Sequence, residues 1–71
     1  MAKYRVIDVE TGNEDLHPVE SKAVTPAGFL KLFYARWPKA PRGRFFVVPD
    51  DDGAVVYTWN GAYSVAKFRR V

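Results

Sequence analysis

The sequence contains no cysteine, which excludes a disulfide framework and any metal site built on thiolates. It contains one histidine, His17, whereas a zinc site needs about four nitrogen or sulfur ligands. We therefore expect no metal and no cofactor. The sequence also lacks the apolar core of a signal peptide and any run of about 18 apolar residues. These absences predict a soluble, cytoplasmic protein that does not associate with membranes.

Residues typical of enzymatic sites are also scarce. His17 has no nucleophile beside it, and we interpret it as a solvated residue of an edge strand. The two serines, Ser21 and Ser64, lie outside any nucleophile-elbow pattern, and no glycine-rich phosphate loop is present. The run from Asp50 to Gly53 lacks the alternating acids of a calcium loop, so it indicates a hairpin turn. We expect no enzymatic activity and no small-molecule substrate.

The length of the chain limits it to one small domain, residues 1–71. A chain of 71 residues buries only about 60% of the surface it exposes when unfolded. Aromatic residues make up 15% of the sequence, so their packing must supply much of the stability.

Acidic residues are missing from residues 22–49, although the formal net charge is only +3. The acids instead gather in residues 1–21 and at Asp50, Asp51 and Asp52. Such segregation creates a local field that the net charge hides. The basic residues of the acid-free stretch are Lys22, Lys31, Arg36, Lys39, Arg42 and Arg44.

Hydrophobic spacing and turn residues predict a ββαβββ order. Alternation predicts a strand over 3–10 and a weaker edge strand over 17–24. Thr25 suits a helix N-cap and Pro26 suits the first helical position, while Pro38 ends the helix. Further strands are predicted over 44–49, 54–59 and 62–70. The apolar stripe of the helix comprises Pro26, Phe29, Leu30, Phe33, Tyr34 and Trp37.

The predicted fold is therefore α+β, with an antiparallel β-sheet and a single amphipathic helix packed on one face. Asn60-Gly61 favours a two-residue hairpin turn, which places Tyr57 opposite Ser64 and Trp59 opposite Ala62. On this register the face toward the helix carries Val55, Tyr57, Trp59, Ala62, Ala66 and Phe68. An even-length turn at Asp50–Gly53 adds Phe46 and Val48 to that face, and an odd turn adds Phe45 and Val47 instead.

Two surfaces remain as candidates for binding. The first is the basic helix face and loop, whose cations Lys31, Arg36, Lys39, Arg42 and Arg44 suit a phosphate backbone. The second is the sheet face away from the helix, which on the even register shows Phe45, Val47, Val56, Thr58, Tyr63, Val65, Lys67 and Arg69. Aromatic residues beside cations suit base stacking, and they suit a protein interface or a homodimer equally well.

These surfaces predict a non-catalytic module that binds nucleic acid, or a protein bound to nucleic acid. The alternative is a small protein-binding inhibitor or adaptor, monomeric or homodimeric, of the type that phages and mobile elements encode. DNA, RNA and protein all remain open as the partner.

Overall fold

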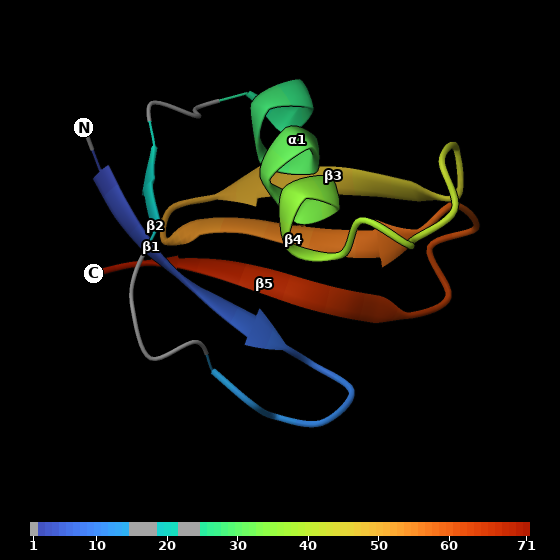
Figure 1. Ribbon diagram of the computed structural model, residues 1–71, viewed down its shortest axis with the longest axis horizontal. Coiled ribbons are helices and arrows are strands. Elements are labelled where there is room, and N and C mark those ends of the chain that lie inside the picture. The colour runs from blue at the N-terminus through green and yellow to red at the C-terminus, as the bar shows by residue number, and fades with distance from the viewer. Residues whose placement is uncertain (1, 15–18, 22–24) are drawn as a thin grey trace.

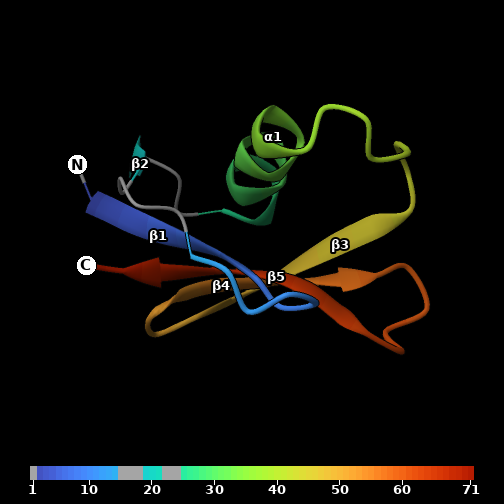
Figure 2. The same cartoon turned by 60° about the horizontal axis from the view of Figure 1, so that its bottom comes forward.

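The computed structural model describes residues 2–14, 19–21 and 25–71. Five antiparallel strands form one sheet in the order β2-β1-β5-β4-β3, and α1 covers one face of it (Figures 1 and 2). The fold is therefore α+β, as the sequence predicts. The elements are β1 (Ala2–Asp8), β2 (Val19–Ser21), α1 (Pro26–Arg36), β3 (Phe45–Asp50), β4 (Gly53–Thr58) and β5 (Ser64–Arg70).

The ends of α1 follow the local sequence. The Thr25 hydroxyl accepts a hydrogen bond from the Gly28 N–H at 3.2 Å. Pro26 occupies the start of the helix, where its missing N–H costs no hydrogen bond because the first N–H groups have no partner within the helix. The Trp37 N–H donates to the Phe33 carbonyl at 2.9 Å, and the chain leaves the helix before Pro38. The predicted N-cap, start and end of the helix are confirmed.

Aromatic side chains join α1 to the sheet. The ring of Phe29 lies edge-on to Tyr4 at 5.2 Å and contacts Phe68 at 5.5 Å. Small residues beneath the helix, such as Ala54 and Ala66, let it approach the sheet closely. Burial of each large apolar side chain contributes about 1.5 to 3 kcal/mol. The buried cluster is Tyr4, Val6, Phe29, Phe33, Tyr34, Val47, Ala54, Val56, Ala66 and Phe68.

The predicted faces of β3 and β4 are wrong. Val47 and Val56 are buried beneath the helix, although we expected them on the open face. Phe46 and Val48, expected in the core, are 39% and 45% exposed. Strand alternation places the half-buried Val55 and Tyr57 on that same outer face. Trp59, also expected in the core, is 65% exposed.

A β-bulge explains the exchange of faces. The turn between β3 and β4 is even, since Asp50 pairs with Gly53, and Tyr57 pairs with Ser64 as predicted. The register then shifts, because Val56 pairs with Ala66 and leaves Val65 as an extra residue in β5. A shift of one residue moves a strand's side chains to the opposite face. Ala66 and Phe68 therefore face the helix as predicted, whereas Phe46, Val48, Val55 and Tyr57 do not.

Gly53 opens β4 at a position that only glycine can occupy. Its φ is +146°, and a Cβ there would overlap the Phe68 carbonyl oxygen of β5. The turn between β3 and β4 therefore lies tightly against β5.

The first strand pairs with the fifth. Tyr4 lies opposite Arg70, and the Val71 N–H donates to the Lys3 carbonyl at 2.9 Å. β5 thus lies between β1 and β4 in the sheet. Of the weaker strand expected over 17–24, Val19–Ser21 forms β2 at the sheet edge, and His17 lies outside the described residues. In the described part of the chain, no helix is long and apolar enough to cross a membrane.

Candidate binding groove

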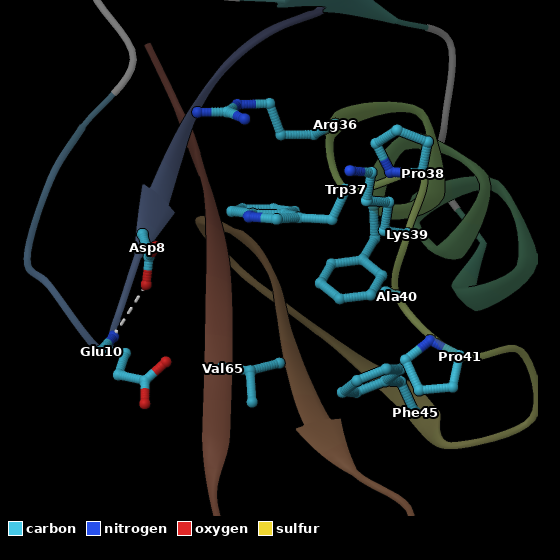
Figure 3. Close-up of a pocket in the computed structure, with 11 residues that line it drawn as sticks. Asp8, Glu10, Arg36, Trp37, Pro38, Lys39, Ala40, Pro41, Phe45 and Val65 are labelled. Carbon is cyan, nitrogen blue, oxygen red and sulfur yellow. Dashed lines mark hydrogen bonds between the residues drawn. The ribbon is translucent and has the colours of Figure 1, made fainter.

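An open groove of about 500 Å³ lies where the end of α1 meets β1 and β5 (Figure 3). Three segments far apart in the sequence contribute to it: residues 8–10, residues 33–45 and Val65. Its apolar lining includes Phe33, Trp37, Phe45 and Val65. The groove is a product of the tertiary fold, because no one segment supplies more than part of its wall.

The apolar lining follows from two local features. Pro38 ends the helix directly after Trp37, which leaves the indole half-buried and packed on the Phe33 ring at 5.1 Å. The Phe33 ring in turn contacts Phe45 at 4.9 Å. The bulge in β5 leaves Val65 partly buried against the core beside Ala66, because a bulge redirects the side chain of its extra residue.

Short-range bonds hold the segment that follows the helix. The Ala40 N–H donates to the Trp37 carbonyl at 3.1 Å, and the Tyr34 hydroxyl donates to the Pro41 carbonyl at 3.2 Å. The Arg42 guanidinium lies over the Tyr34 ring, 4.2 Å from its centre. These contacts hold Lys39 and Arg42, the cations of the segment after the helix, close to α1.

The basic residues predicted as a binding surface are all exposed, and the structure places four of them in two separate groups on α1 and the segment after it. Arg36 and Lys39 line the groove, and the Arg36 guanidinium lies over the Trp37 ring at 5.0 Å. Lys31 and Arg42 lie together in a shallow depression that Tyr34 also lines. Among the described residues, Lys31, Lys39 and Arg42 form no ion pair.

Arg44, the fifth predicted cation, lies elsewhere. Its carbonyl accepts a hydrogen bond from the Trp59 N–H at 2.8 Å, next to the start of β3. Its exposed side chain is not among those that line the groove. Arg44 therefore lies outside the groove.

Two acids line the groove on the side of β1, across from Lys39 (Figure 3). One carboxylate oxygen of Asp8 accepts hydrogen bonds from the N–H groups of Glu10 and Thr11, at 3.0 and 3.4 Å, which fixes the turn after β1. The exposed Glu10 carboxylate forms no hydrogen bond or ion pair within the part of the chain that the structure describes. The groove thus has a basic wall and an acidic wall, separated by apolar side chains.

The open sheet face carries an apolar surface, but not from the residues expected. Phe46 stacks on Tyr57 at 5.5 Å with an interplanar angle of 22°. Phe45, predicted on this face, instead packs on Phe33 beneath the helix, because the bulge reverses the face of β3. Tyr63 is 71% exposed, but it lies in the loop between β4 and β5.

Of the basic residues predicted beside this surface, Lys67 and Arg69 are exposed. They pair with Val55 and Gly53, which places them on the outer face as expected. Arg69 also forms an ion pair with Glu14 at 3.9 Å.

Sequence reasoning missed the groove itself. Trp37 is predicted only as a core residue, and Glu10 and Val65 are not connected with it. The Trp37-Pro38 pair is a signal that could have indicated an aromatic side chain left at a helix end.

No cluster of three or more acidic or histidine side chains suited to a metal ion occurs within residues 2–14, 19–21 and 25–71. Comparison with protein-family models, curated proteins and solved structures gives no match for this chain.

Proposed function

We propose that the protein binds single-stranded nucleic acid through the groove and the cations around it, without catalysing a reaction. The observation that carries this proposal is an aromatic groove, lined by Trp37 and Phe45, that Arg36 and Lys39 also line. Aromatic side chains accept unpaired bases by stacking, at about 1 to 3 kcal/mol per base. Lysine and arginine at the rim contribute by neutralising phosphates and releasing counterions.

Two further cations support contacts to phosphates outside the groove. Lys31 and Arg42 lie together in a separate depression along α1, and neither is neutralised by a carboxylate among the described residues. Arg42 is held against an aromatic ring, which limits the side-chain entropy lost when it binds a phosphate. A single strand is favoured over a duplex because only unpaired bases present their faces to an aromatic groove.

The proposal is tested by fluorescence anisotropy with a labelled single strand of about 12 nucleotides at several salt concentrations. Combining Lys31→Glu with Lys39→Glu should weaken binding at least about tenfold and reduce the salt slope by about 1.4, because each phosphate contact on a single strand contributes about 0.7. Both residues are exposed, so stability should change by less than about 0.5 kcal/mol each.

Lys67→Glu is the matched control, since Lys67 is an exposed cation on the outer face of the sheet. It should bind the strand nearly as well as the unaltered protein does. Unchanged binding by the double variant, or an equal loss in the control, would contradict binding at the groove.

A second candidate function is protein binding through the open sheet face, as an inhibitor or adaptor that acts as a monomer or a homodimer. It is favoured by the exposed Phe46 and Val48 and by Trp59 in the adjoining loop. Analytical ultracentrifugation tests the homodimer: Phe46→Ser should convert a dimer to a monomer while the fold is retained. A monomeric unaltered protein would remove the homodimer from this alternative.

A further inference from the structure

We propose that the groove selects one guanine base, and that Glu10 is the residue that recognises it. This inference rests on the proposed binding of nucleic acid and adds a base preference to it. Three features carry it: the apolar space beside Trp37, the unpartnered Glu10 carboxylate, and Lys39 on the opposite wall.

The apolar part of the groove suits a planar ring. In Figure 3 the indole of Trp37 lies edge-on above Val65, with space between them, and the Phe45 ring lies beside that space. The volume of about 500 Å³ falls within the range of about 300 to 1,000 Å³ found for small-ligand sites. A base that enters between Trp37 and Val65 would lose water from both faces of its ring and gain contacts with these two side chains instead.

The acidic wall distinguishes among the bases. A carboxylate only accepts hydrogen bonds, and its two oxygens are best matched by two parallel N–H donors. Guanine presents such a pair, the ring N1–H and the 2-amino group. Adenine and cytosine place an acceptor nitrogen beside their amino group, and thymine and uracil flank their single N–H with carbonyl oxygens. Each of these would set an acceptor against the second carboxylate oxygen.

Glu10 is the carboxylate available for this role. Asp8 already accepts two backbone hydrogen bonds, whereas the Glu10 side chain has no partner among the described residues. Figure 3 shows Glu10 beside Val65, across the groove from Pro41.

The two walls together suit a nucleotide in one orientation. Lys39 lies across the groove from the acids, so it would contact the phosphate while Glu10 contacts the base edge. An arginine side chain of a protein partner also offers paired N–H donors, and the test includes it as a competing occupant.

Two tryptophans complicate a fluorescence test, and the structure offers a way to separate them. Trp59 is 65% exposed, so Trp59→Phe should leave the fold intact and Trp37 as the sole reporter. Guanosine monophosphate should quench Trp37 and bind at least about fivefold more tightly than inosine monophosphate, which lacks the 2-amino group. Adenosine and uridine monophosphates should bind no better than inosine monophosphate.

The role of Glu10 is tested on a thymidine strand of about 12 nucleotides with one central guanine, compared with the same strand carrying hypoxanthine or thymine there. Glu10→Gln should reduce the guanine preference to less than about twofold. Asp51→Asn is the matched control, because it removes the same charge from an exposed acid in the β3–β4 turn. The control should keep the preference.

The outcomes separate the inference from the proposed function. Equal binding to all these strands, with Trp37 unquenched, overturns the guanine site and leaves nucleic-acid binding in place. Failure to bind any strand overturns both. A change in Trp37 fluorescence on adding N-acetylarginine amide, with no change on adding guanosine monophosphate, also overturns the inference. The groove would then accept a protein side chain and not a guanine base.

Discussion

Phe45 and Phe46 are neighbours in β3 that face opposite sides of the sheet, so their alanine variants should differ in stability. The Phe45 ring packs on Phe33 at 4.9 Å and on Tyr34 at 6.5 Å beneath the helix. Its removal should lower the free energy of unfolding by about 3 kcal/mol, the lower end of the range for a core phenylalanine because the ring is only partly buried.

Phe46 is 39% exposed and contacts mainly its cross-strand neighbour Tyr57, so Phe46→Ala should lower the free energy of unfolding by only about 1 kcal/mol. A domain of this size changes its Tm by about 4 to 8 °C per kcal/mol. Thermal unfolding followed by circular dichroism should therefore show Phe45→Ala melting about 8 to 16 °C below Phe46→Ala. Equal Tm values, or a lower Tm for Phe46→Ala, would refute the bulge and restore the register expected from sequence.

Three further predictions concern the backbone and the surface. Gly53→Ala should prevent a native fold, because the added Cβ overlaps the Phe68 carbonyl. Gly12 is also at positive φ but has open space around it, so Gly12→Ala should lower the free energy of unfolding by only about 1 kcal/mol. Urea unfolding compares the two variants. Thr25→Ala removes the N-cap hydroxyl and should lower the unfolding free energy by about 1 kcal/mol in the same assay. Glu14→Gln breaks an exposed ion pair with Arg69 and should change the unfolding free energy by less than about 1 kcal/mol, and a larger loss would show that this pair fixes the loop after β1.

Elements of this fold that depend on neighbouring residues are predictable from the sequence. Thr25, Pro26 and Pro38 define the helix because an N-cap, a fixed φ and a missing donor act within one turn. The strand faces are not predictable in the same way. Asn60-Gly61 correctly indicates the turn region and the pairing of Tyr57 with Ser64. The predicted pairing of Trp59 with Ala62 is wrong, because both residues lie in the loop between β4 and β5, and nothing near Val65 signals a bulge. That extra residue is stabilised by packing against the core, which the local sequence does not record.

The candidate site likewise has a part that is predictable from the sequence and a part that is not. Exposure of Lys31, Arg36, Lys39 and Arg42 follows from the helical period and a proline-rich loop. The groove forms only when residues 8–10 and Val65 lie beside the end of α1. These segments are far apart in the sequence, so their proximity could not be predicted from local patterns. Phe45 could not be placed until the sheet register was known, because adjacent strand residues differ only by the face that they occupy.

The pairing of β1 with β5 sets an order for folding. Joining Tyr4 to Arg70 closes a loop of about 66 residues, at an entropic cost of about 4 kcal/mol, whereas joining Tyr57 to Ser64 closes a far shorter loop for about 2 kcal/mol. The β4–β5 hairpin should therefore form before β1 docks on it. β5 follows every other described element in the chain. β1 and β2 can therefore join the sheet only after the β4–β5 hairpin has formed and the edge of β5 is free to pair with β1. Such long-range closure is typical of sheets that refold in milliseconds to seconds, despite the small size of this chain.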